Sequence, residues 1–440
     1  MSAYYFQLGL RSLRRNPALT ALMVMAIGFG VAASMITWSV FRAVSGNPIP
    51  DKAGQLYAVQ IDNFGPQHAD NGQGEPPEAL NYTDATAVIK AHKARHQTLF
   101  YQVAPSVLPQ SNHSLPLTAD GYATNADFFG MFEVPFQYGG PWPASDDDAR
   151  ASVAVISSEL NQQLFGGSNS VGRELTLDNH AYRIVGVTGH WDPKPRFYDL
   201  YDGNGFADPV QLYVPFTRAV DVQMDAAGRN HCSGAQSSDL AGREGWLHGE
   251  CVWIPVWVEL ADNAEAASYR AFLTHYAADQ QRAGRFQWAP NVRLRNVDQW
   301  LAFEKVVPPE SRISLLVALG FFVICLVNTI GLLLAKFMRR AAEIGVRRAL
   351  GAPRREIYRQ FLIEAATVGL AGGVLGLLLT ALGMLGVGLL FEPQIARLAQ
   401  LDASLVALTL LVAIVATVLA AFYPAWRAAR VQPAWQLKSN

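Results

Sequence analysis

The stretch ALTALMVMAIGFGVAASMITWSVFRAV, residues 18–44, contains no charged side chain before Arg42. About 20 apolar residues are enough for a helix to cross a hydrocarbon core of ~30 Å, and only a helix satisfies its own backbone groups there. The stretch exceeds the ~7–15 apolar residues of a cleavable signal, and no small-x-small cleavage site follows it. It therefore predicts a permanent transmembrane helix over residues 18–45.

Three further apolar stretches are long enough to cross a membrane, at residues 312–336, 363–391 and 403–424. The 440-residue chain is 50% hydrophobic and 16% charged, and the part between the first two stretches is polar. This distribution indicates an α-helical membrane protein with four transmembrane helices and a large extracytoplasmic α/β domain inserted between helices 1 and 2. The formal net charge of −1 gives no sign of a nucleic-acid partner.

Basic residues near the ends of the apolar stretches predict the orientation, because cytoplasmic loops are enriched in lysine and arginine. The loop between the third and fourth stretches offers only Arg397, against Glu392 and Asp402. We therefore expect residues 1–17, 337–362 and 425–440 to be cytoplasmic and 46–311 to lie outside. The basic residues on the cytoplasmic side are Arg11, Arg14, Arg15, Lys336, Arg339, Arg340, Arg347, Arg348, Arg354, Arg355, Arg359, Arg427, Arg430 and Lys438.

The outer stretch mixes strand and helix signals, as an α/β domain does. A hairpin is expected where residues 174–177 and 181–187 flank Asp178-Asn179-His180. Runs rich in Val, Ile, Tyr and Trp predict strands at residues 56–61, 153–156, 182–187 and 252–260.

Helix and loop signals complete the outer stretch. Either Ser157 or Ser158 could cap a helix that ends at Gly166. Residues 264–281 predict a longer amphipathic helix. The polar stretches at residues 65–78 and 225–249 are expected to be long loops.

Two of the three cysteines, Cys232 and Cys251, lie in the outer stretch. A disulfide between them suits an oxidising compartment. Free thiols, or a metal site shared with His231 and His248, are the alternatives, although the tight Cys-x-x-Cys spacing of a zinc site is absent. Cys325 falls within the second apolar stretch and is expected to be a small packing residue.

The loop between the second and third apolar stretches has its own helix chemistry. It reads AKFMRRAAEIGVRRALGAPRREIYRQFLIEA, residues 335–365. Glu343 and Arg347 stand at i and i+4 in the favourable order. Gly351 can end a helix and Pro353 can start the next one. The residues alone leave two alternatives open: a docking element, or a basic loop with a solvated short helix.

The same loop resembles the signature R-x-x-E-I-G-x-R-R-A-L-G-A of the MacB/FtsX permease family. Gln360 to Ala365 resembles the family's entry into its third helix, and the tail from Pro424 to Arg430 and Pro433 to Lys438 resembles its C-terminal motif. Lys438 replaces the usual Arg there, and Trp426 departs from the pattern. The signature match comprises Arg340, Glu343, Ile344, Gly345, Arg347, Arg348, Ala349, Leu350, Gly351 and Ala352.

The outer stretch and the N-terminus extend this resemblance. Leu8 to Pro17 is similar to the amphipathic segment that precedes the family's first helix. The pattern of a MacB-like periplasmic core domain is carried by Phe128-Phe129, Val153 to Ser157, Leu164 to Gly167 and Val171-Gly172.

The resemblance implies a permease subunit of an ABC-type mechanotransmission machine in the bacterial inner membrane. The signature segment would dock on an ABC ATPase dimer, with Ile344 and Leu350 buried in a groove of that ATPase. The third stretch carries two small-xxx-small registers for close helix contact, at Gly369, Gly372, Gly373 and Gly376.

No nucleotide-binding or catalytic motif is recognisable in the chain. The P-loop pattern G-x-x-x-x-G-K-[ST] does not occur, so ATP and Mg²⁺ are expected on a separate ATPase chain. We expect no catalytic residue, no metal site and no cofactor on this chain. A second permease copy or a related permease is expected as a partner, and a periplasmic adaptor and outer-membrane channel could join them.

Several functions are compatible with this architecture. The size of the outer stretch favours export of peptides, antibiotics or other amphiphiles from the periplasm. A lipoprotein-release permease and an FtsX-like transducer that activates a periplasmic partner are the alternatives within the family. A membrane-anchored binding protein without an ATPase is the alternative outside it.

Overall fold

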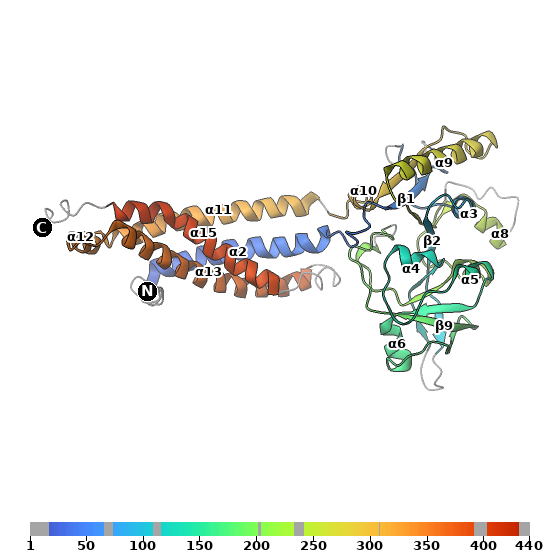
Figure 1. Cartoon of the computed structure of the whole chain (residues 1–440), viewed down its shortest axis with the longest axis horizontal. Coiled ribbons are helices and arrows are strands. Elements are labelled where there is room, and N and C mark those ends of the chain that lie inside the picture. The colour runs from blue at the N-terminus through green and yellow to red at the C-terminus, as the bar shows by residue number, and fades with distance from the viewer. Residues whose placement is uncertain are drawn as a thin grey trace. The chain divides into compact units, whose positions relative to one another are not determined.

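The computed structural model describes residues 17–65, 74–108, 116–200, 204–232, 242–307, 309–390 and 403–430. The chain divides into an outer domain, Gly46–Val306, and a helical unit made of Met1–Ser45 and Val307–Asn440 (Figure 1). Each is described by itself. The expected N-terminal amphipathic segment, apart from Pro17, and the tail motif from Pro433 lie outside the described residues.

Within its described residues, the helical unit contains four helices long and apolar enough to cross a membrane. The fold class predicted from the sequence is confirmed. One difference is that the third long helix begins at Arg354, directly after Pro353, rather than near Ile363, so its first turns are charged. The helices are α2 (Pro17–Ser45), α11 (Pro309–Met338), α13 (Arg354–Leu390) and α15 (Ala403–Ala429), with the short α12 (Ala341–Ala349) between α11 and α13.

The glycines of α13 set the spacing of the long helices. A Cβ on Gly369 would lie 2.9 Å from the Ala413 carbonyl oxygen of α15. A Cβ on Gly372 would lie 2.7 Å from the Cγ2 atom of Ile27 in α2. Alternate glycines therefore let two different helices approach α13 closely, and Gly373 faces α15 while Gly376 faces α2.

The outer domain is built on one long mixed sheet. Among the described residues its strand order is β14-β1-β13-β2-β5-β10-β7-β9-β8-β3-β4, with β6 paired to β9. The strands are β1 (Leu56–Ile61), β2 (His96–Val103), β3 (Ser106–Leu108), β4 (Leu117–Thr118), β5 (Gly121–Thr124), β6 (Phe136–Gly139), β7 (Val153–Ile156), β8 (Glu174–Leu177), β9 (His180–Thr188), β10 (Leu212–Pro215), β13 (Val256–Glu259) and β14 (Val292–Asn296).

Helices cover the faces of this sheet, and a separate two-stranded pair lies beside it. The pair is β11 (His231–Cys232) with β12 (Cys251–Val252). The helices are α3 (Tyr82–Lys90), α4 (Asp127–Met131), α5 (Ala144–Asp148), α6 (Ser158–Phe165), α7 (Phe216–Asp221), α8 (Gly242–Leu247), α9 (Asn263–Arg282) and α10 (Val297–Phe303).

Local signals in the outer domain are mostly confirmed. The Ser157 side chain accepts a hydrogen bond from the Leu160 N–H, and α6 ends at Gly166 in the left-handed conformation. The β8–β9 hairpin forms as expected. The expected loop at residues 225–249 is wrong in part: α8 forms there, although its sequence GREGWL has poor helix formers at two of six positions.

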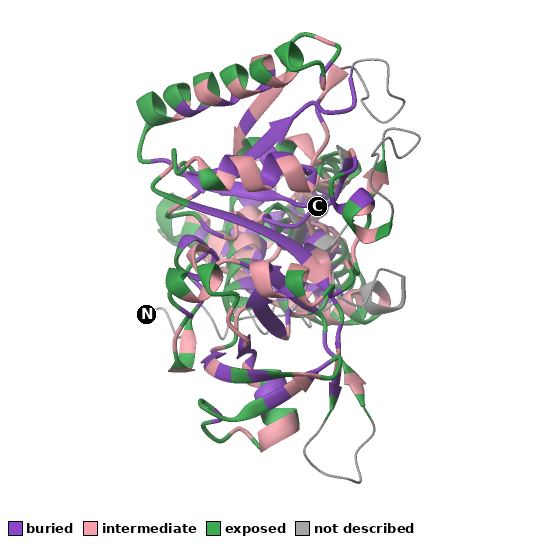
Figure 2. Cartoon of the chain, turned by 90° about the vertical axis from the view of Figure 1, so that its right-hand side faces the viewer, coloured by how far each residue is buried: buried purple, intermediate pink, exposed green. Residues whose placement is uncertain are grey.

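The sheet separates two hydrophobic cores. In β1, Tyr57 and Val59 pack into one core and Leu56 and Ala58 into the other. The strand is thus buried on both faces, and Figure 2 shows buried strands flanked by helices with exposed outer sides. Successive side chains alternate across a strand, so a strand covered on both faces requires a largely apolar run. LYAVQI is such a run, and the amide of its one polar residue, Gln60, donates to the Pro76 and Pro77 carbonyl oxygens.

Candidate functional site

The coupling segment, α12 with its flanking turns, forms a helix that the sequence starts and stops sharply. α11 ends at Met338 and the helix resumes at Ala341. Glu343 lies in its first turn and Arg347 and Arg348 in its last, which complements the helix dipole. Gly351, with φ of 96°, turns the chain out of the helix before α13 starts.

The inner face of α12 is part of the core of the helical unit. Ile344 is only 5% exposed and belongs to the same cluster as Phe337 and Phe361. This corrects the expectation that Ile344 would bury in a groove of a partner. The Leu350 side chain is 83% exposed, and Val346 beside it is also exposed, so docking through Leu350 stays a prediction. The apolar surface that the coupling segment presents is therefore Val346 and Leu350.

A buried ionic cluster joins the coupling segment to two long helices. Arg340 Nη1 lies 3.0 Å from Glu364 Oε2 of α13, and Arg340 Nε lies 3.3 Å from Glu343 Oε2 of α12. The other Glu364 oxygen, Oε1, lies 2.9 Å from Lys336 Nζ of α11. Lys336 and Glu364 are almost completely buried. Because breaking a buried pair leaves an uncompensated charge, this cluster strongly opposes separation of the three helices.

Two further residues, Arg347 and Arg348, fasten α12 to neighbouring helices. Arg347 Nη2 donates to Glu343 Oε1 at 2.6 Å and Arg347 Nη1 to Gln360 Oε1 of α13 at 3.3 Å. Arg348 Nη1 donates to the Ala429 carbonyl oxygen of α15 at 3.4 Å. α12 is thus held by α11, α13 and α15.

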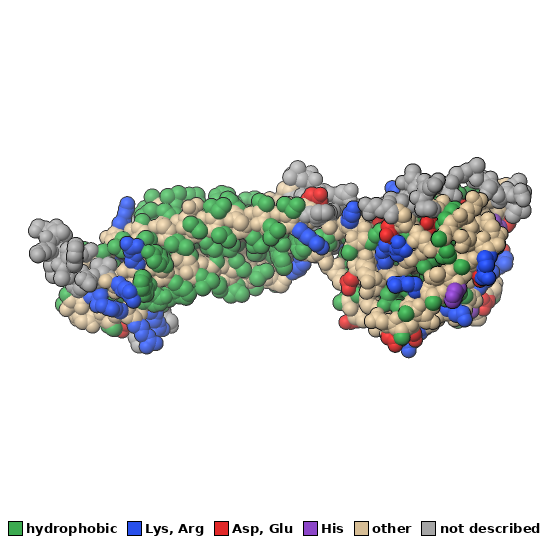
Figure 3. All heavy atoms as spheres, turned by 90° about the horizontal axis from the view of Figure 1, so that it is seen from above, with side chains coloured by type: hydrophobic (Ala, Val, Ile, Leu, Met, Phe, Trp, Pro, Cys, Tyr) green, Lys and Arg blue, Asp and Glu red, His purple; other side chains and the backbone are tan. Residues whose placement is uncertain are grey.

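The surface of the helical unit is strongly patterned. Figure 3 shows an apolar band along the long helices and lysine and arginine side chains gathered at the end that carries α12. Such a pattern fits a hydrocarbon-crossing bundle with a basic end. The side of the membrane on which that end lies stays a prediction.

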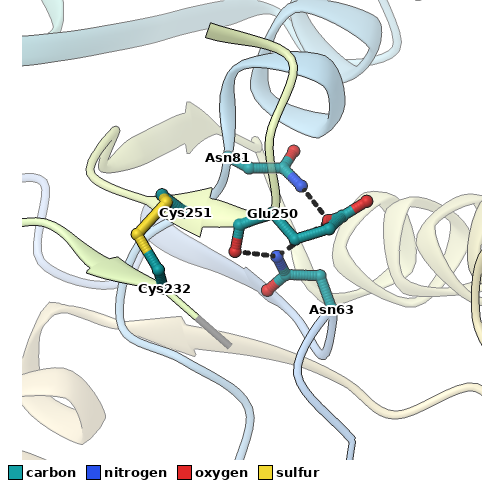
Figure 4. Close-up of a disulfide and its surroundings, with 5 residues drawn as sticks. All are labelled: Asn63, Asn81, Cys232, Glu250 and Cys251. Carbon is teal, nitrogen blue, oxygen red and sulfur yellow. Dashed lines mark hydrogen bonds between the residues drawn. A yellow bond between two sulfur atoms is a disulfide. The ribbon is translucent and has the colours of Figure 1, made fainter. Parts of the chain in front are cut away.

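In the outer domain, Cys232 and Cys251 form a disulfide that closes the β11–β12 pair (Figure 4). The carboxylate of Glu250, next to Cys251, accepts from the side-chain amides of Asn81 at 2.5 Å and Asn63 at 3.1 Å. The thiols of both cysteines are used in this bond. The structure therefore favours the disulfide over the metal alternative at this place.

Two sequence-family models match this chain. The model described as MacB-like periplasmic core domain matches residues 20–275, and the model described as FtsX-like permease C-terminal matches residues 315–433. The chain belongs to the MacB/FtsX family of ABC transporter permeases. In this MacB/FtsX permease, the coupling segment and the ionic cluster lie within the FtsX-like match, and the disulfide lies within the MacB-like match.

Curated relatives of this MacB/FtsX permease are longer proteins. It is 26% identical over 366 residues to a Salmonella typhi protein named macrolide export ATP-binding/permease protein MacB, covering 82% of this chain and 48% of the relative. The protein of that name from Escherichia coli K12 is 24% identical over 387 residues, covering 84% of this chain and 51% of the relative. The chain thus spans about half the length of these relatives.

Solved structures give a weaker likeness. The periplasmic region of MacB from Actinobacillus actinomycetemcomitans is similar with a TM-score of 0.36 at 14% identity, covering 58% of this chain and 94% of that one.

Sequence reasoning missed the ionic cluster of this MacB/FtsX permease. Glu364 was noted only as part of a motif, and Lys336 only as a basic residue near a helix end. The available signal was Glu364, an acidic residue inside the third apolar stretch. A charge in a spanning segment carries a high free-energy cost and therefore needs a partner.

Proposed function

We propose that this permease couples ATP hydrolysis by an ABC ATPase to the export of peptides, antibiotics or other amphiphiles. The observation that carries the proposal is α12: a helix fastened to three long helices that still presents an exposed Leu350. An interface has an apolar centre and a polar rim, and an exposed leucine with charged neighbours supplies both elements. The ATPase is placed on another chain, and neither ATP nor Mg²⁺ binds to this one.

Coupling would proceed through contacts rather than through chemistry on this chain. Closure of an ATPase dimer around ATP would move α12. The cluster of Arg340, Glu364 and Lys336 would carry that motion into α11 and α13, and the long helices would pass it to the outer domain. Two permeases, either identical or related, would be needed to match the two halves of an ATPase dimer.

Export is preferred to lipoprotein release and to activation of a periplasmic enzyme. Its support is the name of the relatives, which are called macrolide export proteins, and the large MacB-like domain. An adaptor and an outer-membrane channel would complete the route. The proposed location is the bacterial inner membrane with both termini cytoplasmic.

The proposal is tested by co-expressing the permease with each ABC ATPase subunit encoded in the same genome and keeping the one that co-purifies with the wild type. Leu350→Asp should abolish co-purification and transport, because burying a carboxylate at an apolar anchor costs ~2 kcal/mol or more. The matched control is Val171→Asp, an exposed apolar residue of the outer domain. Wild-type assembly and transport by Leu350→Asp would refute the proposal.

A further inference from the structure

A second surface of the outer domain has features of a binding site that the coupling function does not use. It is a cleft of ≈ 440 Å³ along β14, lined by Arg270, Val292, Arg293, Leu294, Arg295 and Gln299. β14 is the last strand of the sheet order among the described residues, so one of its edges has no neighbouring strand there. We propose that this cleft binds an acidic, extended segment of a partner protein by strand addition.

The register of β14 shows which backbone groups face the cleft. Its neighbour β1 pairs antiparallel with it, and the Asp62 N–H donates to the Asn291 carbonyl. Backbone groups alternate in direction along a strand, so those of Val292 and Leu294 point away from β1. In agreement, the Leu294 carbonyl accepts from Arg270 Nη2 at 3.3 Å on the outer side. The edge therefore offers the Val292 and Leu294 N–H groups to an added strand. Its two outward carbonyls now accept from arginine side chains, Val292 from Arg293 Nη1 at 3.1 Å and Leu294 from Arg270 Nη2, and an added strand would replace these side chains.

Two of the lining arginines already pair with a carboxylate beside the cleft, that of Glu75, which is not itself a lining residue. Glu75 Oε2 lies 3.2 Å from Arg293 Nε and 2.5 Å from Arg295 Nη2. Arg295 is held in place by stacking on the Phe303 ring, 4.0 Å from its centroid. Guanidinium groups bind carboxylates in a fixed planar geometry, and here two of them are positioned for it.

Arg270 supplies the charge available to a partner. It projects from α9, is exposed, and has no carboxylate partner among the described residues. Three arginines against the single Glu75 leave the cleft positive. Charged side chains on an edge strand also discourage aggregation, but that role requires no cleft and no carboxylate geometry. Charge and edge geometry together select an acidic peptide that can adopt a strand.

The test uses the full-length permease in phosphatidylcholine nanodiscs and a fluorescein-labelled peptide that alternates valine and aspartate. Fluorescence anisotropy should show saturable binding, weakened about tenfold by Arg270→Glu. Arg282→Glu on the same helix is the control for net charge, since Arg282 is 79% exposed and lies outside the cleft. That variant should stay within about twofold of wild type.

Two further measurements test strand pairing and the position of the bound peptide separately. A peptide with proline in place of each valine keeps its charge but cannot pair as a strand, so it should bind at least about tenfold more weakly. A photo-crosslinker at Gln299 should capture the valine–aspartate peptide, and Arg270→Gln should reduce the yield even if Arg270→Glu misfolds. Equal effects of Arg270→Glu and Arg282→Glu, or equal binding of both peptides, would overturn the proposal.

Discussion

Each unit of the molecule places an arginine between two carboxylates. One cluster joins parts of a single folded domain, and the other joins separate helices. In the outer domain, Arg285 lies 2.5 Å from Asp84 Oδ2 and 2.7 Å from Glu250 Oε1, all within one domain. In the helical unit, Arg340 joins Glu343 and Glu364, which belong to separate helices.

The Arg285 cluster stabilises a fold, whereas the Arg340 cluster would, in the function proposed above, also transmit a motion. The Arg285 cluster lies beside a disulfide and a continuous sheet, so its surroundings are already fixed by other bonds. The Arg340 cluster lies where α11 ends, α12 begins and α13 passes, and in the proposed coupling it would make these helices move together. Loss of the Arg285 cluster should lower the stability of the fold alone. Loss of the Arg340 cluster should also weaken the coupling of ATP hydrolysis to transport.

The largest effect is expected for Glu364→Ala, which leaves the buried Lys336 without its carboxylate. The free energy of unfolding of the purified permease should fall by about 3–5 kcal/mol. The double substitution Lys336→Met with Glu364→Leu should recover most of this loss, because a matched apolar pair replaces the ions. Chemical denaturation checks both, and equal losses in the single and double variants would contradict the account.

Arg340→Gln and Arg285→Gln test the comparison directly. Both should destabilise by about 3 kcal/mol, since each removes an arginine from paired carboxylates. Only Arg340→Gln should reduce ATP hydrolysis and transport per assembled complex. The measurement is ATPase activity at a temperature where both variants remain folded, and equal coupling defects would remove the distinction.

Much of this comparison could be predicted from sequence, but only where the signal is local. The Glu343–Arg347 pair and the Ser157 cap follow from spacing within one helix. The bond between Lys336 and Glu364 depends on how two helices pack, which no local pattern encodes. For the same reason, sequence alone predicts equal apolar roles for Ile344 and Leu350, whereas packing buries the first and exposes the second.

The disulfide is expected to stabilise the outer domain by an intermediate amount. Cys232 and Cys251 are 19 residues apart, and closing a loop of this size contributes ~3 kcal/mol in the chain-entropy model. Cys232→Ser with Cys251→Ser should lower the unfolding free energy accordingly while leaving ATPase coupling intact. Mass spectrometry of non-reduced peptides should recover the bridged pair, and two freely alkylated thiols would contradict the prediction.

The smallest effect concerns Glu304, in the turn after α10. Burial, and then the nearby Glu78, raise the pKa of Glu304 to about 8, although Arg295 opposes this. The folded state therefore keeps a proton that the unfolded chain releases near its usual pKa of 4.5, so stability falls as pH rises from about 4.5 to about 8.

Glu304→Gln should remove that slope and raise the Tm by about 2–4 °C at alkaline pH, which corresponds to ~1 kcal/mol after allowing for partial exposure. Thermal scans on both sides of the window check it, with the exposed Asp51→Asn as control. An unchanged pH slope in Glu304→Gln would contradict the prediction.

The central claim is that α12 contacts an ATPase through Leu350, and in-cell photo-crosslinking tests it most directly. A photoreactive amino acid at position 350 should form a covalent adduct that mass spectrometry identifies as the ABC ATPase. The same probe at the buried Ile344, or at Val171 of the outer domain, should not form it. An ATPase adduct at position 171 but not at position 350 would contradict the account. So would the absence of any ATPase adduct at position 350 in cells where transport is intact.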